Sequence, residues 1–299
     1  MSALGFVCGK RLPCPAVALL VLLAACTGET KNTDDTGEDT QGAAGNGLPE
    51  GASTWSGSME VGPFLFLLNF ELENTGGDLV AVATFEDDPN MPAGMGSATY
   101  RLTGTHDPVS GRLALAPDRW VGEDRSELEL IGATATYDPA TQTIRGMIVD
   151  YAAGGDNVLY GGEVSATLTS GDGAPTRVGD GGRALGKGSR SFAGTLQCTG
   201  AVRDVAGAFD YDGQGGMVGT MTIGDTTVDN PLGAFEFTGV HNSTTGGITL
   251  VPGLWQDPDH NTLTFFIDGT YDPGSGAFTG DQRTQINACP PGTWNVVVE

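Results

Sequence analysis

The sequence is poor in basic residues. Its 299 residues contain 14 Lys and Arg against 37 Asp and Glu, which gives a formal net charge of −23. Binding to nucleic acid depends on Lys and Arg that neutralise phosphates, so this balance argues against a nucleic-acid partner. A strongly acidic surface favours solubility and is repelled by anionic surfaces. Attachment to a membrane would therefore need a source of attraction other than charge.

The sequence also has no apolar run long enough to cross a bilayer as a helix. A spanning helix needs about 20 apolar residues, and the apolar stretch from Ala16 to Ala25 is shorter than that. It follows the basic pair Lys10 and Arg11, which is the order found in a secretory signal peptide. The end of the stretch, Leu-Ala-Ala-Cys, resembles the lipobox of bacterial lipoproteins, and this resemblance implies cleavage before Cys26 and lipidation of its thiol.

Residues 1–25 are therefore predicted to be a lipoprotein signal peptide, with Cys26 as the lipid attachment site. An ordinary secretory signal with an incidental cysteine is the alternative. Thr27, rather than an aspartate, follows the cysteine, and by the enteric sorting rule this favours the outer membrane over the inner membrane. Cleavage removes two basic residues and no acidic one, so the mature chain has 12 basic and 37 acidic residues, a net charge of −25. The predicted location is the cell envelope, with the lipid as the membrane contact.

Cysteine is scarce, with five residues in the whole chain. Cys8 and Cys14 leave with the signal peptide and Cys26 carries lipid, so Cys198 and Cys289 are the pair that stays free. Two thiols in an oxidising compartment predict one disulfide bond. A metal site is the rival interpretation, but two cysteines without a nearby His or Cys cluster do not supply four zinc ligands.

The sequence lacks the short motifs of common enzymes, including Gly-x-Ser-x-Gly, His-Glu-x-x-His and the phosphate-binding loop. No cofactor is predicted. Paired carboxylates, as in glycoside hydrolases, are the catalytic option that we considered. The candidates are Glu86, Asp87, Asp88, Asp257 and Asp259. Their positions differ between the two halves of the chain, which argues against a shared catalytic role.

Large apolar residues are nearly absent between Cys26 and Ser53, a segment with six acidic residues and one lysine. Such a segment cannot bury a core, so residues 26–53 are predicted to be a disordered acidic tether. A calcium loop is the alternative, because acidic residues cluster there. However, the spacing of Asp34, Asp35, Glu38 and Asp39 lacks the order of an EF-hand.

The rest of the chain contains two copies of one module. Residues 100–120 align with residues 235–255 at an offset of 135, and residues 70–77 align with residues 209–216 at 139. Within residues 132–146, the part from residue 134 onward aligns with residues 268–280 at an offset of 134. Three blocks in the same order indicate a duplicated domain. The predicted organisation is module one at 54–169, a flexible glycine-rich linker at 170–190, and module two at 191–299.

Hydrophobic residues in both modules alternate with a period of two, and we find no convincing amphipathic helix. Runs such as residues 79–85, 128–137 and 262–271 are rich in β-branched and aromatic residues and are bounded by Gly, Pro, Asn and Asp. Asp-Pro pairs followed by glycine are typical of hairpin turns. The prediction is an all-β protein of two tandem antiparallel meander β-barrels, with about eight strands each. Two-sheet β-sandwiches are the second choice.

Module two has a recognisable framework of short motifs. Its parts are Phe192, Gly194 and Cys198, the strand Gly233–Gly239, the turn Ile248–Trp255, Gly269-Thr270-Tyr271, Phe278-Thr279-Gly280 and Cys289. This framework resembles a β-rich module of exported bacterial proteins that is sometimes appended to caspase-like peptidases. Module one shares the framework without the cysteines, with Val61 near the position of Cys198. The resemblance implies a fold, and it implies no activity.

Two residue types occupy matching positions in both modules. His106 and His241 each follow a Thr-Gly-x sequence. They could act as ligands or bases, or they could be turn-stabilising or exposed histidines, and we favour the second interpretation. Trp120 and Trp255 follow a Pro-x-x, where they could stack on a sugar or plug the end of a barrel. Plugging is favoured, and the two tryptophans remain the candidate ligand contacts.

The function expected from the sequence is a membrane-anchored, non-catalytic binding or structural protein of the cell envelope, with a glycan or an envelope protein as ligand. One alternative is an envelope polysaccharide hydrolase that uses loop carboxylates. A second alternative is a surface partner or inhibitor of a protease, which is suggested by the proteins in which the resembling module occurs.

Overall fold

The computed structural model describes residues 45–61, 64–87, 97–122, 131–151, 159–198, 201–225, 228–256, 265–283 and 292–299. These residues form sixteen β-strands, and residues 41–299 make one compact unit. The described residues contain no helix that is both long and apolar enough to cross a membrane.

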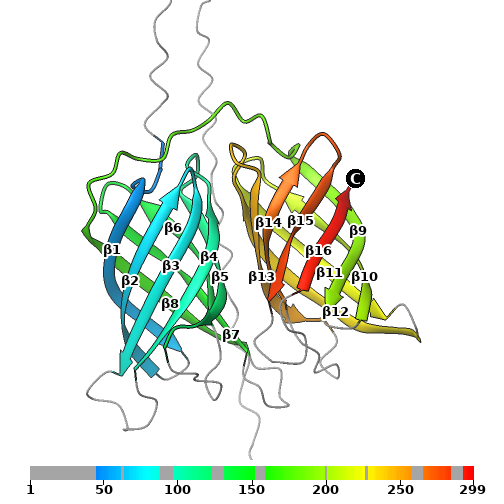
Figure 1. Cartoon of the computed structure of the whole chain (residues 1–299), viewed down its shortest axis with the longest axis horizontal. Helices are drawn as coiled ribbons and strands as arrows, with labels where there is room; N and C mark the ends of the chain where they lie inside the picture. Colours follow the sequence, from blue (N-terminus) through cyan, green and yellow to red (C-terminus); the bar gives the residue numbers. More distant parts are fainter. Residues whose placement is uncertain are drawn as a thin grey trace, which may run out of the picture. The chain divides into compact units, whose positions relative to one another are not determined.

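Barrel one consists of eight antiparallel strands that follow one another along the chain (Figure 1). They are β1 (Gly51–Val61), β2 (Phe64–Thr75), β3 (Asp78–Asp87), β4 (Ala98–His106), β5 (Arg112–Trp120), β6 (Gly132–Asp138), β7 (Thr143–Tyr151) and β8 (Leu159–Ser170). Strand β8 pairs back onto β1, with Ala166 opposite Gly57. The closed ring leaves no unpaired strand edge.

Barrel two repeats this arrangement. Its strands are β9 (Gly188–Cys198), β10 (Ala201–Tyr211), β11 (Gly216–Asp225), β12 (Val228–His241), β13 (Gly247–Trp255), β14 (Phe266–Asp272), β15 (Ala277–Arg283) and β16 (Gly292–Val298). Strand β16 closes onto β9, with Val296 opposite Gly194. The predicted pair of eight-stranded antiparallel meander barrels is therefore confirmed, and the β-sandwich alternative is not what the chain forms.

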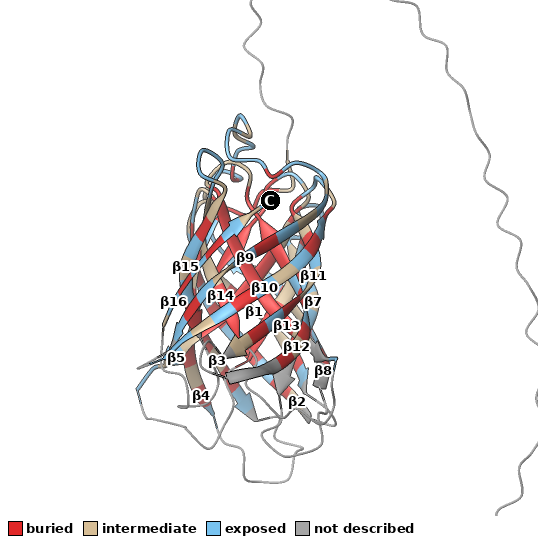
Figure 2. Cartoon of the chain, turned by 90° about the vertical axis from the view of Figure 1, so that its right-hand side faces the viewer, coloured by how far each residue is buried: buried red, intermediate tan, exposed pale blue. Residues whose placement is uncertain are grey.

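The period-two pattern of the sequence points alternate side chains into each barrel. On β2, Phe66, Leu68, Phe70 and Leu72 are buried, whereas Leu67 between them is 45% exposed. Buried and exposed residues alternate in the same way along other strands (Figure 2). Each large apolar side chain that is removed from water in this way contributes about 1.5–3 kcal/mol.

Each barrel has its own apolar core. In barrel one the Trp55 ring stacks on Phe70 at 5.9 Å between centroids and meets Tyr137 edge-on at 5.8 Å. In barrel two Phe192 contacts the Trp294 ring at 5.9 Å. The aromatic residues that marked strands in the sequence are thus the residues that fill the interiors.

The segments before β1 and before β9 differ from the expected tether and linker. The tether was expected to reach residue 53, but β1 begins at Gly51 and Leu48 is fully buried. The linker was expected to be flexible over residues 170–190, but the N–H of Thr176 donates to the Leu48 carbonyl at 2.8 Å and the N–H of Glu50 donates to the Ala174 carbonyl at 2.8 Å. Backbone hydrogen bonds and one buried apolar side chain in each segment, Leu48 or Leu185, therefore order both. Residues 26–44 lie outside the described residues.

The two barrels also share an apolar contact. Ala114 and Ala116 of β5 cluster with Val240, Val251 and Phe266 of barrel two, and all five are buried. The Phe266 ring lies over Gly132, where an added Cβ would come within 2.1 Å of a ring carbon. Gly132 and Phe266 correspond to each other in the repeat at the offset of 134. At this position the two copies have therefore diverged: barrel two carries the phenylalanine ring, and barrel one carries a glycine that leaves room for it.

Buried polar contacts accompany this cluster. Asn242 Nδ2 donates to the carbonyls of Gly76 and His106 in barrel one, each at 2.9 Å. The hydroxyls of Thr105 and Thr249 lie 2.9 Å apart. Because these groups are satisfied across the interface, separating the barrels would leave backbone acceptors without protein partners.

Candidate functional site

His106 is completely buried at the end of β4, where it ties the segment before β1 to the barrel. The N–H of Leu48 donates to His106 Nε2 at 3.0 Å, and His106 Nδ1 lies 3.1 Å from the Arg112 carbonyl. Since Nε2 accepts, Nδ1 must carry the proton, so the ring is neutral. Burial lowers the pKa of His106 to about 4, although the Arg112 carbonyl and Asp107 act in the opposite direction.

His241 repeats the arrangement at the end of β12. The N–H of Leu185 donates to His241 Nε2 at 3.3 Å, and Nδ1 lies 3.2 Å from the Gly247 carbonyl. A second carbonyl, that of Arg183, lies 3.0 Å from Nε2. Burial again lowers the pKa of this histidine, while the carbonyls of Gly247 and Arg183 favour the protonated ring.

Both histidines therefore stabilise turns and strand entries, the role favoured from the sequence, and both are buried rather than exposed. Each holds a buried leucine, Leu48 or Leu185, placed just before the first strand of its barrel. Sequence reasoning missed these leucines because each is a single apolar residue in an otherwise polar or glycine-rich segment. The available signal was the repeated spacing of leucine and glycine, Leu48 to Gly51 and Leu185 to Gly188.

Trp120 lies at the end of β5 and is partly buried against the core of barrel one. Its ring meets Tyr100 at 5.7 Å and Phe85 at 6.4 Å, both edge-on. This packing corresponds to the plugging role. Trp255 is the last residue of β13 and pairs with Phe235, but its side chain lies outside the described residues.

The other residues singled out in the sequence contribute little to a described site. Glu86 is an exposed side chain on β3. The side chains of the remaining candidates lie outside the described residues: Cys26, Cys198, Cys289, Asp87, Asp88, Asp257 and Asp259. The predicted disulfide therefore stays a prediction. Within the described ranges, no three His, Cys, Asp or Glu side chains are grouped so that they could hold a metal ion.

The barrel interiors are filled or nearly so. The enclosed cavity of barrel two has a volume of about 10 Å³ and that of barrel one about 50 Å³. Pockets for small molecules usually measure about 300–1,000 Å³. Neither interior offers room of that kind.

A larger hollow, the inter-barrel groove, lies on the outside between strands β5–β7 of barrel one and β10–β12 of barrel two. Its volume is about 460 Å³. A second hollow of about 490 Å³ covers the outer face of β10–β12 and shares Asp210, Val218 and Thr238 with the groove. The two hollows are therefore adjacent on the surface of barrel two.

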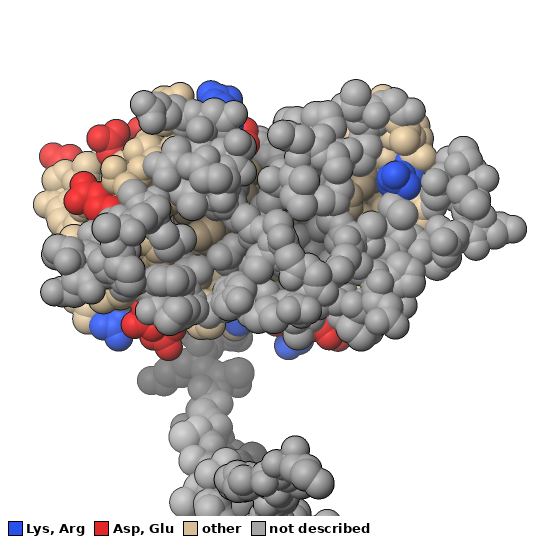
Figure 3. Space-filling view, turned by 90° about the horizontal axis from the view of Figure 1, so that it is seen from below, with Lys and Arg blue, Asp and Glu red and all other residues tan. Residues whose placement is uncertain are grey.

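The inter-barrel groove combines apolar and charged side chains. Its apolar side chains include Met147 and Val218, which are 48% and 62% exposed. Arg145 and Asp210 add exposed charges of opposite sign. The groove can therefore offer both apolar contact and charged hydrogen-bond groups to a ligand. On the face of the molecule seen in Figure 3, described basic side chains lie scattered rather than in one patch.

One ion pair crosses the groove, from Arg112 of β5 to Asp212 beside β10. Burial raises the pKa of Asp212, but hydrogen bonds from Arg112 and from the N–H groups of Gln214 and Gly216 outweigh it and hold the pKa below its usual value. Both side chains remain 40% exposed. An exposed pair of this kind contributes about 0–1 kcal/mol, so the apolar cluster and not the ion pair dominates the barrel contact.

Neither a protein-family model nor a curated protein matches the chain. Among solved structures, the chain is similar to kievitone hydratase from Nectria haematococca, with 9% sequence identity and a TM-score of 0.24. The match covers 87% of this chain and 92% of that chain. A TM-score this low transfers no function to the present chain.

Proposed function

We propose that this chain is an exported, lipid-anchored protein of the cell envelope, and that its two barrels act together as a non-catalytic binding unit. The ligand contacts the inter-barrel groove. The observation that supports this proposal is the contrast between interiors of about 10 and 50 Å³ and a groove of about 460 Å³. The groove and the adjoining hollow of about 490 Å³ fall in the usual range of ligand pockets, whereas the two interiors do not.

The described buried histidines support a non-catalytic role. In both rings the two nitrogens face backbone groups of the adjacent turn and of the segment before the first strand of the barrel. A general base must have a nitrogen free to reach the proton that it removes. His106 and His241 are committed to structure instead.

The groove suits an extended ligand, such as a glycan chain or a peptide segment of an envelope protein. It continues into the second hollow through Asp210, Val218 and Thr238, so a linear molecule could contact both. Val218 lies at the junction and is the most exposed large apolar residue among those described. An apolar side chain there would gain stabilisation by being covered.

A binding screen with groove variants tests this proposal. The soluble form without the lipidated cysteine, residues 27–299, is probed on a glycan array and by pull-down of envelope components, together with Val218→Glu and Met147→Glu. We expect both variants to bind any retained component at least about tenfold more weakly, since a buried charge without a partner is costly. Val202→Glu, at a valine that is 47% exposed outside the groove, is the matched control and should bind normally.

Two outcomes would contradict the proposal. One is that the mature chain retains no envelope component in either screen. The other is that Val202→Glu weakens binding as much as Val218→Glu, because the effect would then reflect added negative charge and not the groove.

The lipid anchor is tested separately. Cells that express the full chain are fed labelled palmitate, and Cys26→Ser is compared with Cys14→Ser. We expect the label on the unchanged chain and on Cys14→Ser, and its loss from Cys26→Ser together with release of the protein from the membrane fraction. Label that persists in Cys26→Ser would rule out this residue as the attachment site.

A further inference from the structure

The two barrels have the same strand order but unequal interiors. The cavity enclosed by barrel one is about 50 Å³, and that of barrel two is about 10 Å³. Both are built from the same repeated framework, so the difference must come from individual side chains.

Strand register identifies these side chains. Gly146 pairs with Val164 in barrel one, and the equivalent Gly280 pairs with Trp294 in barrel two, so Val164 stands where barrel two has a tryptophan. The repeat offsets match Ile144 to Phe278, Leu102 to Phe237 and Ala133 to Ile267. All of these side chains are buried. At four inward positions barrel one thus carries the smaller residue.

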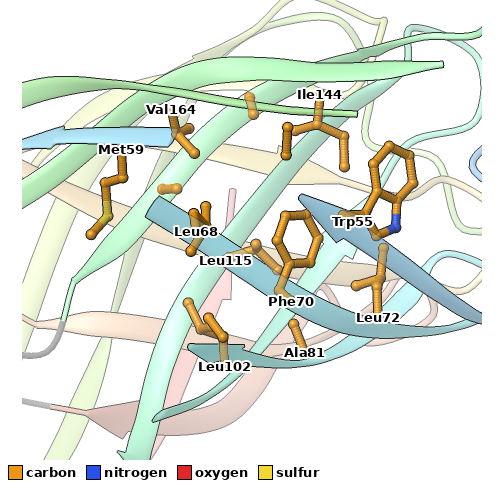
Figure 4. Packing of buried hydrophobic residues seen from close by; sticks show 14 of the residues in the cluster. Trp55, Met59, Leu68, Phe70, Leu72, Ala81, Leu102, Leu115, Ile144 and Val164 are labelled. Carbon is orange, nitrogen blue, oxygen red and sulfur yellow. The ribbon is translucent and has the colours of Figure 1, made fainter. Parts of the chain in front are cut away.

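The space left by these replacements is apolar. Met59, Leu68, Phe70, Leu115, Ile144 and Val164 are among the residues that line it (Figure 4). A void with an apolar lining does not hold water stably, because water there finds no hydrogen-bond partners. Lining atoms also lose dispersion contacts on the empty side. A small apolar guest would restore these contacts without displacing ordered water.

The size of the cavity limits the guest. A volume of about 50 Å³ is far below the range for drug-sized ligands, so only a compact molecule or the end of a short alkyl chain fits. The lining offers no described ionised side chain, which excludes a charged guest.

We propose that the interior of barrel one binds a small, uncharged apolar guest, such as a xenon atom or a short alkyl group, and that the interior of barrel two does not. This site is separate from the inter-barrel groove. It rests on the cavity and on the side-chain differences between the copies, and it does not depend on the function proposed for the groove.

The test uses xenon and methyl NMR spectra of the soluble form, residues 27–299. We expect saturable shifts at methyl groups of Ile144 and Leu115 and none at Ile248 and Ile267 of barrel two. The variant Ala133→Ile gives barrel one the residue of barrel two and should weaken xenon binding by about tenfold or more. If Ala133→Ile does not fold, Leu102→Phe serves the same purpose, also copying barrel two.

Controls separate the cavity from other effects. Val218→Glu in the groove should leave xenon binding unchanged, so failure of the groove proposal would not affect this result. Three results would overturn the cavity proposal: no saturable shift in barrel one, equal shifts in both barrels, or unchanged affinity in the filled variant.

Discussion

Acidification from pH 7 to pH 4 is expected to lower the free energy of unfolding of the mature chain by about 3 kcal/mol through His106 alone. The pKa of this residue is about 4 in the folded chain against 6.5 for an ordinary histidine, mainly because of burial. Above pH 6.5 both states are neutral and the full stability is present. Between pH 6.5 and 4 the unfolded chain binds a proton that the folded chain does not, so stability falls. Below pH 4 His106 causes no further loss.

The structure explains why protonation of His106 is unfavourable. A proton on Nε2 would face the N–H of Leu48, which now donates to that nitrogen. His241 shifts in the same direction, but the Arg183 carbonyl near its Nε2 would accept a hydrogen bond from the protonated ring. We therefore expect His106 to be the more acid-sensitive of the two.

Urea denaturation at several pH values measures this effect. The control is His106→Gln, which keeps a polar side chain but cannot titrate. Protonation of acidic groups such as Asp212, whose pKa is lowered in the folded state, also destabilises the protein in acid. This loss should be equal in His106→Gln and in the unchanged chain. If His106→Gln loses as much stability between pH 7 and 4 as the unchanged chain, the histidine is not responsible.

Phe266→Ala is expected to destabilise the protein by about 3–5 kcal/mol, the usual cost of removing a buried phenylalanine side chain. Phe266 is fully buried and lies over Gly132 at the contact between the barrels. Since this ring belongs to the apolar cluster shared by both barrels, its loss should also uncouple them. Calorimetry should then show two unfolding transitions where the unchanged chain shows one.

The matched control is Val297→Ala, at a barrel-two residue that is 49% exposed and belongs to none of the apolar clusters. It should unfold at nearly the same temperature as the unchanged chain. A single transition in Phe266→Ala, together with a loss below about 1 kcal/mol, would show that the contact between the barrels does not contribute as the structure indicates.

The sequence predicted those features that depend only on residues close to one another along the chain. Alternation such as that of Phe66, Leu68 and Phe70 specifies which face of a strand is buried, and Asp-Pro pairs specify turns. Repeated twice at a nearly constant offset, these local rules predict two meander barrels. The histidines were found in the same way, since His106 and His241 match in the repeat.

The residues that the sequence did not reveal act through contacts between distant segments. Leu48 looked like part of a solvated tether, yet it is fully buried and bonded to a histidine 58 residues away. The contact of Phe266 with Gly132 likewise joins residues that are 134 positions apart. Neither property follows from neighbouring residues, because burial depends on which surfaces the chain brings together.

Alternating hydrophobicity and turn chemistry, both local properties, were enough to determine that this chain forms two all-β modules, and its N-terminal pattern predicts an exported lipoprotein. The tertiary structure decided which interior is filled, where the groove lies and how the barrels are joined. These features depend on the volumes of side chains such as Val164 and Trp294, which meet their neighbours only after the strands have closed into a ring.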